Sequence, residues 1–379
     1  MSTPAIFPFI HAQGSWGDMG QQVGAMFAPL IASHVDAWLA HIARETGASR
    51  AGALATAATF RAPIQEHAAF LWEELNGMAR GSGVSLDELL LLQARAEVLR
   101  AHRVAGRAAP VTPTLECTTF AVGGRRTAGG GVLFGQNVDL APFMEEFGVV
   151  IRQYPKDAPA TLSYTSAGLL GHNGFNEVGV GICANFVDDP TGWGHGLPRY
   201  LLSRLALREG SAEAALKAAL NPPRAASRNL LIADGGGTFI DAECLRDRVG
   251  VIHGADDLLV HANHLEAPSL CGLETPSENS LCRRRRLEEL LTGEAKPLTA
   301  ARINEFYRDH ANHPHSLCAH PFAGRDVKTV ASVIGDLAAL KLHAAKGSPC
   351  QAPYATSTLA TCRTGALSVT VRDPHPATS

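Results

Sequence analysis

The chain has 379 residues, which is longer than most single domains and long enough to bury a substantial core. Hydrophobic residues make up 46% and charged residues 18%, and this composition excludes a disordered chain, a collagen and a disulfide-stapled miniprotein. The formal net charge is only -3. Since such a charge creates no strong field toward phosphates, we expect neither nucleic acid nor a membrane surface as a partner.

The first residues, MSTPAIFPFIHAQG, lack a basic segment followed by an apolar run, and no stretch reaches the roughly 18 apolar residues that span a bilayer. We therefore expect a cytoplasmic protein. Its eight cysteines would stay reduced there. Each can then be a core residue, a metal ligand or a nucleophile.

Residues 21–105 carry apolar side chains three and four positions apart, a spacing that predicts helices. Within this region Ser85 is followed three positions later by Glu88. That pair is a capping box and predicts the start of one long helix over LDELLLLQARAEVLRA. Residues 106–116 contain a glycine and two prolines and are typical of a linker or surface loop.

After this loop the chain consists of short segments rich in β-branched and aromatic residues, bounded by Gly, Pro or Asp. We predict ten strands there: CTTFAVGG, GGVLFGQNVD, FGVVIRQY, ATLSYTSAG, VGVGICANF, NLLIADGG, GTFIDAEC, GVIHG, TVASVIGDL and ALKLHAAKG. Helices are expected around residues 197–219. Runs of strands between helices favour an α+β sandwich of sheets and helices over a wound βαβ fold.

Cys117 lies at the expected start of the first of these strands, in LECTTFAV. A lone cysteine in such a place is more often a small buried hydrophobe than a nucleophile. Two hydroxyl residues, Thr118 and Thr119, follow it, and we expect them to bind substrate. A catalytic role for Cys117 requires further polar residues in its neighbourhood.

Three polar residues downstream can meet that requirement. Asp139 ends GQNVD, which we expect to pair with the Cys117 strand as a hairpin. Asn185 closes GFNEVGVGICANF, and Asn263 lies at the centre of HANH. Each of them alone is typical of a turn, so the interpretation depends on their occurring together.

Taken in chain order, these segments resemble the acyl-coenzyme A:6-aminopenicillanic acid acyltransferase family of the Ntn-hydrolase superfamily, whose nucleophile is an N-terminal cysteine. The resemblance covers roughly residues 14–345. It rests on GSWGDMGQQVG, MARGSGVSLDELLLLQARAE, ECTTFAV, GQNVD, AGLLGHNGFNEVGVGICANF, VHANH, and SLCAHP with TVASVIGDL. More distantly, the same segments are similar to choloylglycine (bile-salt) hydrolases and penicillin V acylases.

The resemblance implies a four-layer αββα fold and a chain that cuts itself before the nucleophile. Residues 1–116 would then be a helical N-terminal segment, the small chain, and residues 117–379 the catalytic core, the large chain, with the two remaining associated. The Cys117 thiol would attack the carbonyl carbon of Glu116, and water would release Cys117 as a new N-terminus. Its α-amine, with a pKa of about 7.7–8.0, can serve as base for the thiol.

The resemblance also implies roles for single residues. Asp139 would balance the charge of the new ammonium group, and Asn263 would donate to the oxyanion of the tetrahedral intermediate. Asn185 would help to bind the acyl carbonyl. Arg325, in AHPFAGRDVKTV, is the nearest match to a late arginine that completes the family's charge network.

Two positions depart from the related sequences. Glu116 stands where the penicillin acyltransferase has Gly, and this change puts the efficiency of self-cleavage in question. Gln136 stands where bile-salt hydrolases have Arg, and it places the sequence with the acyltransferases. Residues 351–379 extend past the last strand of the resemblance.

Two other features suggest different chemistry. The segment DHANHPHSLCAH is dense enough in ligands for zinc, although it is equally a Pro-broken polar loop; its candidate ligands are His310, His313, His315, Cys318 and His320. The family resemblance accounts for parts of it without a metal, so we predict neither metal nor other cofactor. The basic run 283–286 has leucines on both sides and two glutamates after it, which is typical of a solvated helix face.

The sequence thus predicts a self-processing cysteine enzyme that cleaves or transfers an acyl group at an amide bond of a small N-acyl substrate through a Cys117 thioester. Hydrolysis is favoured over transfer. One alternative is an unprocessed binding protein of the same fold, with Glu116 preventing the cut. Another is a zinc hydrolase that uses the 310–320 cluster. The acyl and amine halves of the substrate stay open, as does the formation of a homo-oligomer.

Overall fold

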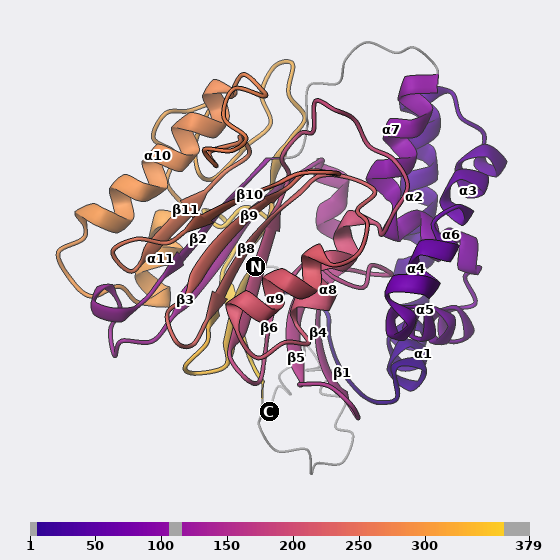
Figure 1. Cartoon of the computed structure of the whole chain (residues 1–379), viewed down its shortest axis with the longest axis horizontal. Coiled ribbons are helices and arrows are strands. Elements are labelled where there is room, and N and C mark those ends of the chain that lie inside the picture. Colours follow the sequence, from indigo (N-terminus) through magenta and orange to yellow (C-terminus); the bar gives the residue numbers. More distant parts are fainter. Residues whose placement is uncertain (1–5, 106–115, 360–379) are drawn as a thin grey trace, which may run out of the picture.

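Two β-sheets stacked face to face form the centre of the molecule in this computed structural model, which describes residues 6–105 and 116–359 (Figure 1). Sheet A has, in spatial order, strands β1 (Phe9–Gly14), β4 (Gly148–Pro155), β5 (Thr161–Ser166), β6 (Asn173–Asn176), β7 (Val180–Asn185), β8 (Arg228–Asp234), β9 (Phe239–Cys244) and β10 (Val249–His253). Sheet B has β11 (Leu258–His261), β2 (Glu116–Val122), β3 (Leu133–Leu140), β12 (Lys328–Asp336), β13 (Lys341–Lys346) and β14 (Tyr354–Thr358).

Helices cover both outer faces of this pair of sheets (Figure 1). The N-terminal helices are α1 (Trp16–Met26), α2 (Ala28–Thr46), α3 (Arg50–Ala58), α4 (Arg61–His67), α5 (Ala69–Ser82), α6 (Leu86–Gln93) and α7 (Arg95–Ala105). The later ones are α8 (Leu202–Ala206), α9 (Ala212–Leu220), α10 (Glu278–Gly293) and α11 (Ala300–Phe306), with short 3-10 turns η1 (Gly124–Arg126), η2 (Pro142–Phe147) and η3 (Arg199–Leu201). Helices α8 and α9 pack on sheet A, whereas α10 and α11 pack on sheet B. The expected four-layer αββα sandwich is confirmed.

All ten strands predicted from the sequence form, and the sequence missed β1, β6, β11 and β14. The predicted hairpin is present: β2 and β3 are antiparallel, with Cys117 opposite Val138 and Glu116 opposite Asp139. Strand β2 is the first strand after the loop, as expected, but it begins at Glu116, so Cys117 is its second residue rather than its first. Because β1 pairs in parallel with β4, the N-terminal segment also adds a strand to sheet A.

The Ser85 capping box is present, with both of its reciprocal hydrogen bonds to Glu88. The single long helix expected after it was wrong, because α6 ends at Gln93 and α7 begins at Arg95. At this break the buried Gln93 side chain donates to the carbonyl of Gly168 (2.8 Å) and accepts from the N–H of Leu170 (3.0 Å). These are long-range bonds, which local sequence patterns do not reveal.

Glycines bring helices α1 and α5 into direct backbone contact. A Cβ at any of four positions would lie 2.0–2.4 Å from a backbone oxygen of the facing helix, closer than real Cβ atoms come; these are Gly20, Gly24, Gly77 and Gly81. The glycine spacing in GSWGDMGQQVG therefore has a packing function. Any larger side chain must push the two helices apart.

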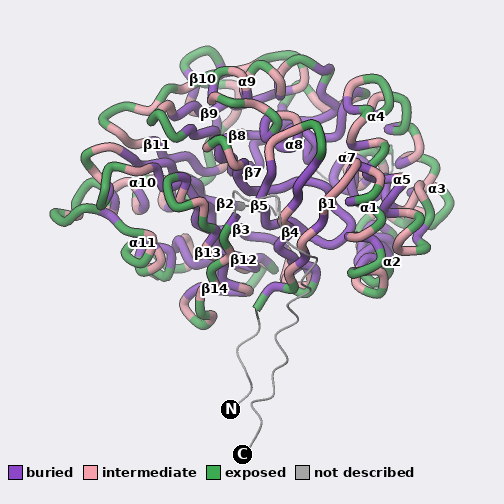
Figure 2. Tube along the Cα trace, turned by 90° about the horizontal axis from the view of Figure 1, so that it is seen from below, coloured by how far each residue is buried: buried purple, intermediate pink, exposed green. Residues whose placement is uncertain are grey.

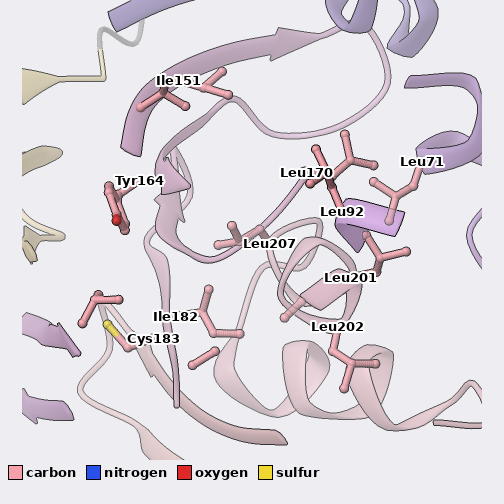
Figure 3. Close-up of a cluster of buried hydrophobic side chains, with 14 of the residues drawn as sticks. Leu71, Leu92, Ile151, Tyr164, Leu170, Ile182, Cys183, Leu201, Leu202 and Leu207 are labelled. Carbon is pink, nitrogen blue, oxygen red and sulfur yellow. The ribbon is translucent and has the colours of Figure 1, made fainter. Parts of the chain in front are cut away.

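One hydrophobic cluster extends from the N-terminal helices through sheet A and into sheet B. Figure 3 shows Leu71 and Leu92 of the N-terminal helices in this cluster, together with Leu170, Leu201 and Leu202. In Figure 2 the buried residues continue from the strands into these helices. Residues 6–105 thus share their core with the strand-rich part. Of the linker predicted at 106–116, residues 106–115 lie outside the described residues, whereas Glu116 begins β2, so the prediction was wrong for that residue. Residues 360–379 of the C-terminal tail also lie outside the described residues.

No single helix in the described ranges is long and apolar enough to cross a membrane. Helices α1 and α2 meet the length and hydropathy criteria only as a pair, and they are bent by 82° at the break between them. Both have a buried face that belongs to the shared hydrophobic cluster.

Candidate active site

Cys117 is the second residue of β2, and its peptide groups are held on both sides. Its N–H donates to Oδ1 of Asn263 (2.7 Å), and its carbonyl oxygen accepts from Nη1 of Arg283 (2.6 Å). The side chain is buried, with 4% exposed. The chain is continuous here from Glu116, so Cys117 is not an N-terminal residue in this structure. The backbone around the thiol is therefore fixed in the uncut chain.

The environment of the Cys117 thiol keeps it protonated. Burial raises its pKa to about 12, and the nearby Asp139 carboxylate adds to this effect. A hydrogen bond from the Asp139 backbone and the charges of Arg228 and Arg283 act in the opposite direction. The uncut chain therefore holds very little thiolate at neutral pH, and the thiol needs a base close by.

Asp139 places a carboxylate beside the Glu116–Cys117 peptide bond, since it lies opposite Glu116 in the β2–β3 ladder. Its Oδ1 accepts from the Thr329 hydroxyl (2.6 Å), while its Oδ2 has no hydrogen-bond partner in the described part of the chain. Burial raises the pKa of Asp139 to about 6, against the effects of Arg283 and Thr329. A buried carboxylate oxygen without a partner is costly, and it can accept a hydrogen bond from a newly formed donor.

Asn263 contacts both the nucleophile and its supporting arginine. Its Oδ1 accepts from the Cys117 N–H and from Nη2 of Arg283 (2.8 Å), and its Nδ2 donates to the carbonyl of Phe186 (2.8 Å). An amide nitrogen carries two hydrogens, so one of them is left for a further acceptor. This geometry suits a donor to an oxyanion beside Cys117.

Arg283 is the site residue that the sequence did not reveal. It was assigned to a solvated helix face, and this was wrong for Arg283, which is fully buried on α10. Arg284, the next residue, agrees with the predicted solvated face, since it pairs with Glu266 and Glu288 at the surface. The sequence did carry a signal, because Leu287 lies one helical turn after Arg283 and belongs to the same buried face.

Asn185 supports the turn that carries Asn263. Its Nδ2 donates to the carbonyl of Ala262, and its Oδ1 accepts from Nδ2 of Asn229 (2.9 Å). It is fully buried, and these bonds hold its amide in place beside His261. The contacts therefore indicate a positioning role for Asn185 rather than direct contact with an acyl carbonyl.

His261 is held by acidic side chains of β9 beneath the same turn. Its Nε2 lies 3.0 Å from Oε1 of Glu243 and 3.5 Å from Oδ2 of Asp241. Burial opposes protonation of His261, but the two carboxylates outweigh it and raise its pKa to about 9. The His261 ring and the Glu243 side chain thus form a buried pair that fixes the HANH segment.

The other predicted site residues lie away from the thiol or use their polar atoms within the fold. The Thr118 hydroxyl accepts from Nη1 of Arg283 (2.6 Å), and the Thr119 hydroxyl faces the carbonyl of His261 at 3.3 Å. Their contacts give no support to the expected substrate-binding role. Arg325 lies in the 321–326 turn, where its guanidinium is 5.6 Å from the centre of the Phe322 ring. The guanidinium that contacts Cys117 and Asn263 is that of Arg283.

Comparison with known proteins identifies the family. The model of the acyl-coenzyme A:6-aminopenicillanic acid acyl-transferase family matches residues 126–351, which is more than half of the chain. The chain belongs to this acyl-transferase family. The match includes Asp139, Asn263 and Arg283 and begins downstream of Cys117, so the assignment of the nucleophile rests on the geometry described above.

A curated relative of the acyl-transferase family agrees with this assignment. The acyl-coenzyme A:6-aminopenicillanic-acid-acyltransferase 40 kDa form of Emericella nidulans is 28% identical over 258 residues, which cover 65% of this chain and 66% of the relative. The similarity thus extends over slightly less than two thirds of that protein. It supports the family and leaves the substrate open.

Two solved structures are similar at a lower level. Penicillin V acylase from Agrobacterium tumefaciens has a TM-score of 0.43 and 12% identity, covering 61% of this chain and 83% of its own. A mutant of the conjugated bile acid hydrolase from Clostridium perfringens has a TM-score of 0.45 and 12% identity, covering 66% of this chain and 100% of its own. At these scores the similarity carries no inference about activity.

Proposed function

We propose that this acyl-transferase family member is a self-processing cysteine enzyme that cleaves an amide bond of a small N-acyl substrate through a thioester on Cys117. The observation that carries the proposal is the partnerless Oδ2 of Asp139, directly across the ladder from the Glu116–Cys117 peptide bond. Cleavage of that bond creates an ammonium group beside a buried carboxylate. The uncut chain thus has an acceptor in place for a donor that only cleavage produces.

Self-cleavage follows from the same contacts. The Cys117 thiol attacks the carbonyl carbon of Glu116, its proton passes to the departing Cys117 nitrogen, and the Glu116 acyl group becomes a thioester. Water then hydrolyses the thioester, which leaves a carboxylic acid on Glu116 and a free thiol and amine on Cys117. Asn263 and Arg283 hold the N–H and C=O of Cys117 during these steps, so the thiol is presented in one orientation.

Turnover repeats this chemistry on an external amide. The free α-amine of Cys117 takes the thiol proton, sulfur attacks the substrate carbonyl, and the remaining Asn263 N–H stabilises the oxyanion. The proton returns to the leaving amine, and water or a second amine releases the acyl group from sulfur. We favour water as acceptor, because transfer needs a second bound molecule and hydrolysis does not.

The test of this proposal is the mass of the purified full chain. We expect fragments of residues 1–116 and 117–379 that stay associated through the shared hydrophobic cluster, and an intact chain for Cys117→Ala. Cys271→Ala, which removes an exposed thiol, is the matched control and should be cut normally. An uncut wild-type chain with amidase activity that survives Cys117→Ala would falsify the proposal.

Alkylation distinguishes this enzyme from an unprocessed binding protein of the same fold. In a processed chain, iodoacetamide should label Cys117 ahead of the other thiols, and an N-acyl substrate should protect it. In an uncut chain the Cys117 thiol stays protonated and buried, so the exposed Cys271 should react first. Location in the cytoplasm and the formation of a homo-oligomer stay predictions.

A further inference from the structure

Four side chains of types that bind metals meet beside sheet B, three from the loop between α11 and β12 and the fourth from the segment after β13. His310 follows α11, Cys318 and His320 precede β12, and Cys350 follows β13. The Nε2 atoms of His310 and His320 are 3.1 Å apart, and Nε2 of His320 is 3.6 Å from Sγ of Cys318 and 3.4 Å from Sγ of Cys350. All four ligand atoms lie within 4.8 Å of one another.

These separations match the edges of a zinc tetrahedron. Zinc lies about 2.0–2.1 Å from histidine nitrogen and about 2.3 Å from cysteine sulfur, so tetrahedral edges are about 3.4 Å between nitrogens and about 3.6 Å between nitrogen and sulfur. We propose that His310, Cys318, His320 and Cys350 bind one Zn²⁺. The prediction of a metal-free loop, made from residues 310–320 alone, could not include Cys350.

The chemistry of the ligands suits a structural site. Two thiolates and two imidazoles are a ligand set typical of structural zinc, and four protein ligands leave no position for a catalytic water. Binding releases the two thiol protons to solvent. His315 of the same loop is used elsewhere, with its Nδ1 3.2 Å from Nδ2 of Asn279.

The zinc site would connect to the active site by two hydrogen bonds. The N–H of Ala319, between the ligands Cys318 and His320, donates to the Thr329 hydroxyl (2.9 Å), which in turn donates to Oδ1 of Asp139 (2.6 Å). A metal that fixes this segment therefore fixes the hydroxyl that orients the Asp139 carboxylate. This is how an outer structural site can support a catalytic residue.

Metal analysis of the full-length, tag-free protein in reducing buffer tests the site. We expect about one zinc per chain and its loss in His310→Ala and Cys350→Ser. His313→Ala and Cys271→Ser remove a neighbouring histidine and an unrelated thiol, and both should keep the metal. Because a variant can lose zinc by failing to fold, Co²⁺ is also added to chelator-treated wild-type protein, where thiolate-to-cobalt charge-transfer absorption is expected.

A wild-type chain that holds no stoichiometric zinc and gives no such cobalt spectrum would overturn the proposal. A Cys318–Cys350 disulfide that persists in reducing buffer would overturn it as well. Zinc that stays in both His310→Ala and Cys350→Ser would show that the metal lies elsewhere.

A second inference rests on a separate observation, three buried arginines around one tyrosine. The guanidinium carbons of Arg95, Arg228 and Arg199 lie 4.0, 4.6 and 5.1 Å from the centre of the Tyr200 ring. The three side chains are at most 3% exposed. They come from α7, η3 and β8, so helical and strand-rich parts of the chain both contribute.

This arginine cluster has more positive charge than its surroundings balance. Five guanidinium nitrogens have no hydrogen-bond partner in the described residues: Nε of Arg95, Nε and Nη1 of Arg199, and Nε and Nη2 of Arg228. One carboxylate, Glu97, lies nearby, and its Oε1 accepts the backbone N–H of Arg199 (2.9 Å). Three buried cations beside one carboxylate leave positive charge unbalanced, which is expensive, so an anion bound here would be strongly favoured.

Arg228 lies on β8, which contacts β2, the strand that carries Cys117. Arg228 is close enough to Cys117 to lower the pKa of its thiol, and the ring of His172 lies 6.0 Å from both Tyr164 and Tyr200. Tyr164 in turn lies within electrostatic reach of Cys117. We infer that Arg95, Arg199 and Arg228 bind a carboxylate of the N-acyl substrate, an inference that rests on the proposed function.

Matched substrate pairs test this subsite. An N-acyl glycine is compared with the N-acyl glycinamide, and a succinyl amide with the butyryl amide, so that a carboxylate on either half of the substrate is detected. We expect the charged member of one pair to have at least a tenfold higher kcat/KM. Arg228→Gln should abolish that preference, while Arg208→Gln, on an exposed arginine, should keep it.

Calorimetry on the Cys117→Ala chain separates this inference from the proposed function. If the charged member of a pair binds that variant and the neutral one does not, the subsite stands even when the wild-type chain turns over neither. Equal binding and equal turnover of charged and neutral members would overturn the subsite and leave the amidase proposal intact.

Discussion

The N-terminal segment, residues 6–105, and the strand-rich part, residues 116–359, share one hydrophobic core but differ in the contacts that organise them. The first packs through apolar faces and glycine contacts, such as Gly77 of α5 against the backbone of α1. The second buries a polar network around Cys117, in which Arg283 and Asn263 fix the backbone and Asp139 keeps one oxygen without a partner.

This difference explains how the fold could tolerate the proposed cut between the two parts. Apolar contacts do not depend on chain continuity, and α1 packs on β4, α2 on η2 and α6 on η3 through non-covalent contacts. The polar network, by contrast, would gain a charge in the proposed cut, because cleavage creates an ammonium group on Cys117. The predictions below test each side of this contrast, from the largest expected effect to the smallest.

Gly77→Ala should have the largest effect, since its Cβ would lie 2.0 Å from the carbonyl oxygen of Gly17. We expect a loss of at least about 3 kcal/mol in the free energy of unfolding, measured in urea, because two backbones must separate. Gly17→Ala is the matched control on the facing helix, where the nearest atom is the mobile end of Arg80 at 3.3 Å. It should change stability by less than about 1 kcal/mol. Equal losses in both variants would contradict glycine packing.

Arg283→Gln should leave the fold largely intact but lower kcat/KM about 100-fold, because the Cys117 carbonyl and Asn263 lose their donor. It should also slow self-cleavage, which a time course of the two fragments measures. Arg285→Gln, on the exposed face of the same helix, is the control and should behave as wild type. Partial rescue by Arg283→Lys is expected. Normal processing and turnover in Arg283→Gln would remove this residue from the site.

Asp139 should make the uncut chain less stable as the pH rises. Its pKa of about 6 in the folded chain exceeds its unfolded value of about 3.9, so its contribution is fully present below pH 4 and is lost as the pH rises through 6. Two pKa units correspond to at most about 3 kcal/mol. Urea unfolding of Cys117→Ala is measured at pH 4.5 and 7.5, with and without Asp139→Asn. The difference between the two chains separates the contribution of Asp139 to the free energy of unfolding from the contributions of other titrating groups. An identical pH dependence in both chains would show that Asp139 is not desolvated.

Ser85→Ala should have the smallest effect, about 1 kcal/mol of unfolding free energy, because α6 loses the hydroxyl that caps its first turn. Ser85→Asn should retain most of the stability, since it also accepts from the helix N-terminus. Cleavage and turnover should be unchanged in both. An effect on kcat/KM would mean that the N-terminal helices are coupled to the site more tightly than the shared core suggests.

Much of the local structure was predictable because it depends on neighbours in sequence. The Ser85 cap, the ten strands and the hairpin that sets Asp139 beside Cys117 follow from turn residues and alternation. The break at Gln93 was not predictable, since that side chain bonds to Gly168 and Leu170 far along the chain. Strand β1 was missed because it pairs with β4, which lies more than a hundred residues away in the chain.

By itself, then, the sequence determined the helical character of most of the N-terminal segment, ten of the described strands, the nucleophile candidate and the candidates Asp139 and Asn263. Only the tertiary structure decided that Arg283 turns inward to the Cys117 carbonyl, and that Cys350 joins His310, Cys318 and His320. The physical reason is the same in both cases. A charged or thiol side chain takes its role from the groups that surround it, and here those groups come from segments that meet only when the sheets and helices pack.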